Sequence, residues 1–196
     1  FRSWGKDLFP AQKGYLDVYH HYGLTGNRSV FAHCVHLEDQ EWQCMHETDS
    51  TIAFCPTSNL FLGSGLFPLK KIWQQQVKVG LGTDIGAGTS FSLLQTVNEA
   101  YKVQQLQGDK LSAFESLYHA TLGGAKALDL DDKLGNFNVG KEADFVVLNL
   151  KPTALQQLRQ SRSKSIEDSL FALFTMGDDR NIEATYIYGQ KAYNQS

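Results

Sequence analysis

The sequence of 196 residues contains few cysteines and no closely spaced pair of them. Its three cysteines, Cys34, Cys44 and Cys55, are odd in number and form no C-x-x-C motif. A disulfide framework needs an even number of cysteines, and a thiolate zinc site needs closely spaced pairs. The sequence therefore predicts neither, and the apolar runs around Cys34 and Cys55 favour packing in a core.

The chain also lacks long apolar runs and an excess of basic residues. No run reaches the roughly 18 residues that a membrane-spanning helix requires, and no signal-peptide pattern opens the chain. The formal net charge is -3 and the pI is near 6.1, so no charge pattern marks a surface for nucleic acid or an anionic membrane. We expect a cytoplasmic protein with no nucleic-acid partner and no membrane partner.

What the chain does contain is the composition of a folded domain. Hydrophobic residues make up 42% and charged residues 20% of the sequence, which is enough apolar surface to build one core. The sequence begins at Phe1 rather than at methionine and runs directly into a segment with a helical pattern. We therefore expect that a longer N-terminal part precedes it.

Strand and helix patterns alternate three times in the first 107 residues. Strand-like apolar runs cover residues 29–35, 51–56 and 77–83, and helical patterns cover 38–47, 66–75 and 92–107. This alternation is typical of right-handed βα units around a parallel sheet. A complete barrel of eight such units takes about 250 residues. If the chain belongs to such a barrel, it contains only the last part of it.

The pattern changes after residue 110. Helices are predicted over 111–128 and 166–175, and strands over 142–148 and 184–188. Two strands that are separated in this way favour a small β annex beside the α/β body. We place the domain boundary after residue 134, with residues 1–134 in the α/β part and residues 135–196 in the annex with a helical contribution.

Three polar residues stand at the ends of the successive predicted strands: His33, Asn59 and Asp84. The carboxyl ends of strands in an α/β barrel share one face, and active sites lie there. Gly86 and Gly88 allow a sharp turn beside Asp84. Each residue alone has a simpler explanation, because an aspartate caps helices, a histidine packs in cores and an asparagine fixes loops. Their convergence is the stronger indication of a site.

The run His36-Leu37-Glu38 matches the H-x-E of the small zinc deaminases of the cytidine type. That fold also requires a P-C-x-x-C motif, which this sequence lacks. Side chains three positions apart on a strand point to opposite faces, so His33 and His36 cannot both reach one metal ion unless His36 already lies in the loop. We expect His36 to lie in a loop and Glu38 to begin a helix.

Several motifs of the chain resemble those of the amidohydrolase superfamily. They are Phe31-Ala-His-Cys-Val-His-Leu37, Cys55-Pro-Thr-Ser-Asn-Leu-Phe-Leu-Gly-Ser-Gly65, Gly80-Leu-Gly-Thr-Asp-Ile-Gly-Ala-Gly88 and Gly135-Asn-Phe-Asn-Val-Gly-Lys-Glu-Ala-Asp-Phe145. Within that superfamily they are most similar to the enzymes that deaminate guanine, as are Ala120-Thr-Leu-Gly-Gly-Ala125 and Gly177-Asp-Asp-Arg-Asn181. The resemblance implies an α/β fold: the C-terminal part, about strands 6–8, of a (β/α)8 metal-dependent hydrolase barrel, plus part of a small β-sandwich.

The resemblance also implies the chemistry of the site. One Zn2+ ion activates a water molecule that converts guanine, a small-molecule purine substrate, to xanthine and ammonia. Asp84 matches the strand 8 aspartate, which ligates zinc and moves a proton from the water to the leaving amine. His33 matches the strand 6 histidine beside the water and the substrate. Both are therefore catalytic and substrate-binding candidates, Asp84 is the metal-binding candidate, and Asn59 is expected to have a structural role.

The family's other site residues do not appear in this sequence. The resemblance places the H-x-H pair of strand 1, the strand 5 histidine and the catalytic glutamate in segments that should precede Phe1. A catalytic zinc usually has three protein ligands, so we expect the 196-residue chain to be inactive alone. The resemblance also implies that the full enzyme is a homodimer. Two alternatives stay open: another amidohydrolase, such as a chlorohydrolase or an adenosine-type deaminase, and a non-catalytic binding protein on the same scaffold.

Overall fold

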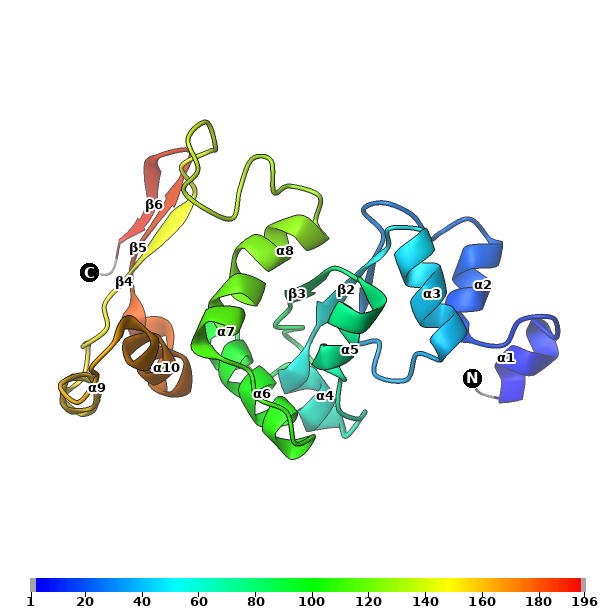
Figure 1. Ribbon diagram of the computed structural model, residues 1–196, viewed down its shortest axis with the longest axis horizontal. Coiled ribbons are helices and arrows are strands. Elements are labelled where there is room, and N and C mark those ends of the chain that lie inside the picture. Colours follow the sequence, from blue (N-terminus) through cyan, green and yellow to red (C-terminus); the bar gives the residue numbers. More distant parts are fainter. Residues whose placement is uncertain (1–2, 195–196) are drawn as a thin grey trace.

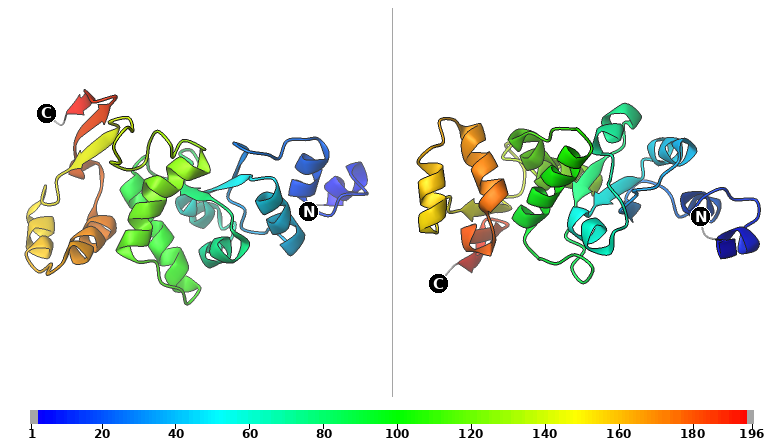
Figure 2. Two further views of the ribbon diagram at one scale, coloured as in Figure 1. Left: turned by 45° about the horizontal axis from the view of Figure 1, so that its top comes forward. Right: turned by 90° about the horizontal axis from the view of Figure 1, so that it is seen from below.

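The computed structural model describes residues 3–194, apart from the side chain of Trp4, and contains two sheets joined by helices. Figure 1 shows the two ends of the chain at opposite ends of the molecule, with the first sheet between them, and both views of Figure 2 show the same separation. Among the described residues, no helix has both the length and the apolar character needed to cross a membrane.

The first sheet is parallel, and its strands lie in the order β1 (Val30–Ala32), β2 (Thr51–Phe54) and β3 (Val79–Leu81). In its register Ala53 of β2 pairs with Ala32 on one side and Gly80 on the other. The predicted alternation of strands and helices is therefore confirmed. The strand β1 lies at the edge of the sheet and leaves Val30 exposed.

Helices precede, connect and follow the strands of this sheet. They are α1 (Ser3–Leu8), α2 (Tyr15–His21), α3 (Asp39–Glu47), α4 (Pro56–Leu62), α5 (Leu69–Gln75), α6 (Leu93–Leu106), α7 (Ala113–Ala120) and α8 (Leu122–Ala127). The sequence did not predict α4, which replaces the polar loop expected after the second strand. Pro56 begins this helix, where its missing N–H costs no hydrogen bond, and Gly63 ends it in a left-handed conformation.

The single helix predicted over 111–128 is two helices in the structure. They meet at Thr121, whose φ of -134° and ψ of -99° interrupt the helical path. The break falls just before the glycine pair Gly123 and Gly124. Trp73 of α5 is 56% exposed, whereas Leu69 and Ile72 of the same helix are buried.

The main core lies between the parallel sheet and its helices. The ring of Phe54 in β2 packs against that of Phe67 with a centroid distance of 4.8 Å and a tilt of 33°, and the ring of Trp42 in α3 lies 6.1 Å from that of Phe67. All three are fully buried, as is Met45, which together with Trp42 forms the buried side of α3. A smaller cluster joins α6 to the C-terminal part of the chain through Leu94, Val97, Ala113, Leu173 and Phe174.

The second sheet is antiparallel and lies near the C-terminal end of the molecule (Figure 1). Its strands are β4 (Phe145–Leu148), β5 (Ile182–Ile187) and β6 (Gln190–Asn194), and its flanking helices are α9 (Ala154–Gln160), α10 (Ile166–Met176) and the short 3-10 helix η1 (Asp179–Asn181). The predicted strands correspond to β4 and β5, whereas β6 and α9 were not predicted. The helix α10 packs against α6 and α7, which belong to the part before residue 134. The domain boundary that we place after residue 134 stays a prediction.

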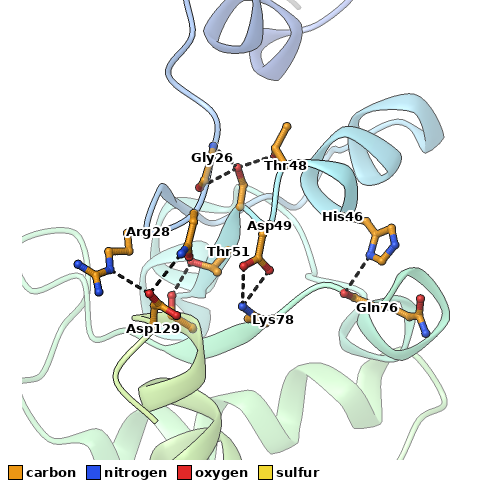
Figure 3. Close-up of polar contacts among 12 residues, drawn as sticks. Gly26, Arg28, His46, Thr48, Asp49, Thr51, Gln76, Lys78 and Asp129 are labelled. Atoms are coloured by element: carbon orange, nitrogen blue, oxygen red, sulfur yellow. Dashed lines mark hydrogen bonds and ion pairs between the residues drawn. The ribbon is translucent and has the colours of Figure 1, made fainter. Parts of the chain in front are cut away.

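Polar contacts tie together the segments at the N-terminal ends of the parallel strands (Figure 3). The Lys78 ammonium lies 2.8 and 2.9 Å from the two carboxylate oxygens of Asp49. Arg28 donates to Asp129 at 3.0 Å, and the Thr51 hydroxyl donates to the carbonyl of Ala127 at 2.8 Å. The last two contacts hold the end of α8 against the start of the sheet, opposite the end where the polar residues predicted from the sequence lie.

Candidate active site

The structure brings together the three polar residues that follow the parallel strands. His33 comes directly after β1, Asn59 lies in α4 after β2, and Asp84 comes shortly after β3. Nδ1 of His33 lies 2.8 Å from Oδ1 of Asn59, and Nε2 of His33 lies 3.6 Å from Oδ2 of Asp84. The imidazole of His33 therefore stands between a buried amide and a carboxylate.

The backbone leaves the strands of this site in an uncommon conformation. His33 has φ of 69° and Asp84 has φ of 48°, in the left-handed region that residues other than glycine rarely adopt. Each such residue costs on the order of 1–3 kcal/mol, and such conformations gather at functional sites. Just before each turn the sheet ladder holds the chain, because the His33 N–H donates to Ala53 and the Gly82 N–H donates to Phe54, both at 2.9 Å.

The turn after Asp84 depends on glycine, as the sequence predicted. A Cβ atom on Gly88 would stand 1.8 Å from the carbonyl oxygen of Thr83, so no side chain fits there. Gly86 has φ of 118°, which glycine adopts without strain. The chain thus folds back on itself beside the carboxylate of Asp84.

Burial divides the site into a fixed base and an accessible face. Asn59 is 1% exposed, whereas the side chains of His33 and Asp84 are 38% and 35% exposed. A carboxylate and an imidazole that face solvent together are groups that bind metal ions and exchange protons with water or substrate. The arrangement therefore has the chemistry of acid–base catalysis, with a buried amide behind it.

The cysteines near the site are protonated thiols. Burial, followed by the charge of Asp84, raises the pKa of Cys55 to about 11, and burial with the charge of Glu41 raises the pKa of Cys34 to about 12. Metal binding and nucleophilic attack require the thiolate form. Both thiols therefore act as packing groups, which agrees with the expectation from the sequence.

His36 and Glu38 lie where the sequence placed them. His36 is in the turn after β1, and its Nε2 atom lies 2.8 Å from the carbonyl oxygen of Ser64. Glu38 is the N-cap of α3 and forms a reciprocal capping box with Glu41. These contacts account for both residues without a metal or catalytic role.

The sequence did not reveal how deeply the residues around Asn59 are buried. Thr57, Ser58 and Asn59 are all buried, and each has a side-chain polar atom without a hydrogen-bond partner among the described residues. A run of Thr, Ser and Asn after a proline usually indicates an exposed turn. No signal in the sequence distinguishes that case from a buried first turn of a helix.

The residues that the structure describes do not form a complete zinc site. Within residues 3–194, leaving out the Trp4 side chain, no group of three or more His, Cys, Asp and Glu side chains is placed to hold a metal ion. A catalytic zinc usually takes three protein ligands. Asp84 and the neighbouring His33 offer at most part of such a set.

Comparison with known proteins shows the family. A family model described as the amidohydrolase family matches residues 4–192. The chain belongs to the amidohydrolase family. Its sequence is 64% identical to guanine deaminase of Escherichia coli (strain K12) over 194 residues, which is 99% of this chain and 44% of that protein. A solved structure of E. coli guanine deaminase matches with a TM-score of 0.97 over 99% of this chain and 45% of that one.

Other amidohydrolase structures are similar over nearly the whole chain. Guanine deaminase from C. acetobutylicum with bound guanine is 32% identical and has a TM-score of 0.84. The match covers 96% of this chain and 45% of that one. An adenosine deaminase from Xanthomonas campestris with bound zinc is 26% identical, with a TM-score of 0.80 over 98% of this chain and 44% of that one. The chain thus spans less than half the length of each of these relatives.

Proposed function

We propose that this chain carries part of the active site of a guanine deaminase, which hydrolyses guanine to xanthine and ammonia. The observation that carries the proposal is the 64% identity to a curated guanine deaminase over 99% of the chain. The relative that holds guanine in its active site supports a small purine as substrate. The pairing of His33 with Asp84 at the strand ends supports a hydrolytic site at that face.

The proposed architecture follows from the same likeness. We assign β1, β2 and β3 to strands 6–8 of a (β/α)8 barrel, and β4–β6 to a small β-sandwich that other segments complete. This chain covers 44% of the E. coli protein and 45% of its solved structure. The rest of such a protein is long enough to supply the remaining strands. In this proposal the complete enzyme is a cytoplasmic homodimer, and the 196 residues alone are inactive.

In the proposed reaction, water adds to C2 of guanine and ammonia leaves. Asp84 accepts a proton from the attacking water and delivers it to the departing amino group, which leaves as ammonia. The second proton of the water ends on ring nitrogen N3, so that C2 becomes the carbonyl of xanthine. His33, with Nε2 3.6 Å from the same carboxylate, faces the water and the purine. This role suits two groups that are each about one-third exposed just beyond the ends of parallel strands.

We propose zinc as the cofactor because zinc is bound in a relative and because Asp84 can serve as a ligand. A zinc ion, when bound, makes a water molecule easier to deprotonate at neutral pH. Asp84 would supply one ligand, and residues outside this chain would have to supply the rest, because the described residues form no complete site. The zinc-bound adenosine deaminase among the relatives supports this cofactor for the family.

The same relative makes adenosine-type deamination the second candidate. Its identity of 26% is much lower than the 64% shared with the E. coli guanine deaminase, so guanine is the better-supported substrate. A chlorohydrolase and a non-catalytic binding protein remain the other two alternatives, and the same assay separates all four.

The test is a substrate panel on the longer protein that carries this chain. Guanine, adenosine and a chlorinated triazine are each incubated with it, and the release of ammonia or chloride is measured. The proposal predicts turnover of guanine well above the other two and no turnover of guanine by the 196-residue chain alone. Preferred turnover of adenosine or triazine, or deamination by the isolated chain, would contradict it.

A further inference from the structure

We propose that Asn59 is a positioning residue that holds His33 in the tautomer with its proton on Nδ1, leaving Nε2 as a proton acceptor beside Asp84. The inference rests on the proposed function, in which His33 and Asp84 act together. It changes the expectation from the sequence, which gave Asn59 a purely structural role. Asn59 would then act on the reaction through His33 and not by touching the substrate.

The position of Asn59 is fixed from two sides by its own backbone. Its N–H donates to the carbonyl of Cys55 at 3.0 Å, and its carbonyl accepts from the N–H of Ser64 at 2.9 Å. The side chain is 1% exposed, so it has little freedom to turn. Since the chain enters α4 directly from β2, the sheet itself determines where the amide stands.

The contact with His33 is the observation from which we infer which ring nitrogen carries the proton. Oδ1 of Asn59 lies 2.8 Å from Nδ1 of His33, within normal hydrogen-bonding distance. An amide oxygen only accepts hydrogen bonds, so Nδ1 must be the donor. A neutral imidazole has one protonated nitrogen, and its Nε2 atom then carries a lone pair.

That lone pair faces the carboxylate of Asp84, whose Oδ2 atom lies 3.6 Å away. Two acceptors that converge in this way form no hydrogen bond with each other. They create a place for a group with protons to donate, such as a water molecule or the amino group of a purine. In the opposite tautomer the Nε2 proton would point at Asp84 and occupy its oxygen.

Structural roles account poorly for Asn59. Its Nδ2 group is buried and has no hydrogen-bond partner among residues 3–194, so His33 is the only side chain there to which the amide is hydrogen-bonded. An unpartnered buried N–H group lowers stability. A leucine of similar volume would fill the same space without that cost. What leucine would lack is the acceptor for Nδ1 of His33.

The tautomer is directly visible in the 15N spectrum of histidine rings. The longer protein is labelled with 15N-histidine, and the His33 and His36 signals are assigned with His33→Gln and His36→Gln variants. His36 serves as an internal reference, because its Nε2 atom lies 2.8 Å from the carbonyl of Ser64 and must carry the proton. We expect the protonated nitrogen to be Nδ1 in His33 and Nε2 in His36.

Two variants then test whether Asn59 sets the tautomer. Asn59→Asp keeps an acceptor at Oδ1 and should keep the proton on Nδ1. Asn59→Leu removes the acceptor and should move the His33 ring toward the Nε2–H form, which Asp84 attracts. The kcat for guanine should fall about 10- to 100-fold in Asn59→Leu, the range typical for partners that orient a functional histidine.

Gln104→Leu is the matched control. Gln104 is also a buried amide with one unpartnered polar atom, and its Nε2 donates to the Phe67 carbonyl at 3.2 Å, with no contact to His33. It should leave the His33 tautomer and kcat unchanged. An Nε2–H form of His33 in the unaltered protein, or an unchanged tautomer in Asn59→Leu, would overturn the inference. An Nδ1–H form in a protein that does not deaminate guanine would instead overturn the proposed function alone.

Discussion

Gly80 in β3 and Gly124 in α8 meet main chain to main chain, because a Cβ atom on Gly80 would stand 2.9 Å from the Cα atom of Gly124. That distance is shorter than any normal contact of a Cβ atom. The contact brings α8 directly against the strand that leads to Asp84. The packing of this helix on the sheet therefore depends on the absence of a side chain at one position.

We predict that Gly80→Ala destabilises the fold by about 1–3 kcal/mol, the usual cost of forcing extra volume into a well-packed core. Backbone atoms of α8 would have to move, since no flexible side chain is present to give way. Urea unfolding followed by far-UV circular dichroism measures the change in the free energy of unfolding.

Gly124→Ala provides the control for this experiment. A Cβ atom on Gly124 would meet only the carbonyl oxygen of His119, at an ordinary 3.6 Å. Alanine also favours a helix over glycine by up to about 1 kcal/mol. This variant should be as stable as the unaltered protein or slightly more stable, and equal losses in both variants would refute the account of the contact.

Thr51 provides a second test of how α8 is fixed to the sheet. Its hydroxyl donates to the Ala127 carbonyl at 2.8 Å, and the residue is 1% exposed. Thr51→Val keeps the shape and the strand preference but removes the donor, so the carbonyl loses a buried partner. The expected loss is about 1–3 kcal/mol in the free energy of unfolding.

The neighbouring ion pair between Arg28 and Asp129 provides a comparison for the Thr51 measurement. Arg28 and Asp129 lie 3.0 Å apart on the surface, with 70% of the arginine side chain exposed (Figure 3). Exposed pairs of this kind add little to stability because water and salt screen them. Arg28→Gln should therefore change the unfolding midpoint much less than Thr51→Val, and a larger change in Arg28→Gln would contradict this ranking.

His119 makes stability depend on pH. It is 2% exposed on α7, and neither ring nitrogen has a hydrogen bond of normal geometry among the described residues, although the Val79 main chain lies near. Burial lowers the pKa of the imidazole from 6.5, against the weaker opposing effects of Val79 and Glu115. The unfolded chain therefore binds a proton more readily than the folded chain.

The sign of the effect follows from that difference. Below pH 6.5 the unfolded state gains a proton that the folded state does not, so the folded state loses stability as the pH falls toward its lowered pKa. His119→Leu should reduce the stability difference between about pH 7.5 and about pH 5.5. The exposed His21 is the control, and His21→Gln should leave that difference unchanged.

The order of strands and helices was predictable because buried strands and amphipathic helices leave strong hydrophobic patterns. The elements that were missed have polar sequences. The strand β6 is exposed throughout and pairs with β5 in an antiparallel ladder, and α9 buries Gln156 and Gln160 rather than apolar side chains. Helix α4 was missed because its residues Thr57 and Ser58 resemble a turn.

The position of the candidate site was predictable, but its internal hydrogen bonds were not. Parallel strands bring their carboxyl ends to one face, which places His33, Asn59 and Asp84 together without any knowledge of side-chain conformation. The contact of Asn59 with His33 depends on the burial of α4 and on the left-handed backbone of His33. Neither feature has a pattern in the sequence.

The most direct test of the account compares guanine turnover by the longer protein with and without the Asp84 carboxylate. Asp84→Asn should lower kcat/KM for guanine by about 100- to 10,000-fold, because the amide cannot accept the proton of the attacking water. Asparagine tolerates the left-handed backbone at this position, so the fold should persist. Asp49→Asn is the matched control, since Asp49 is also left-handed and pairs with Lys78 at the other end of the strands (Figure 3). Full activity in Asp84→Asn would contradict the account, as would an equal loss in both variants.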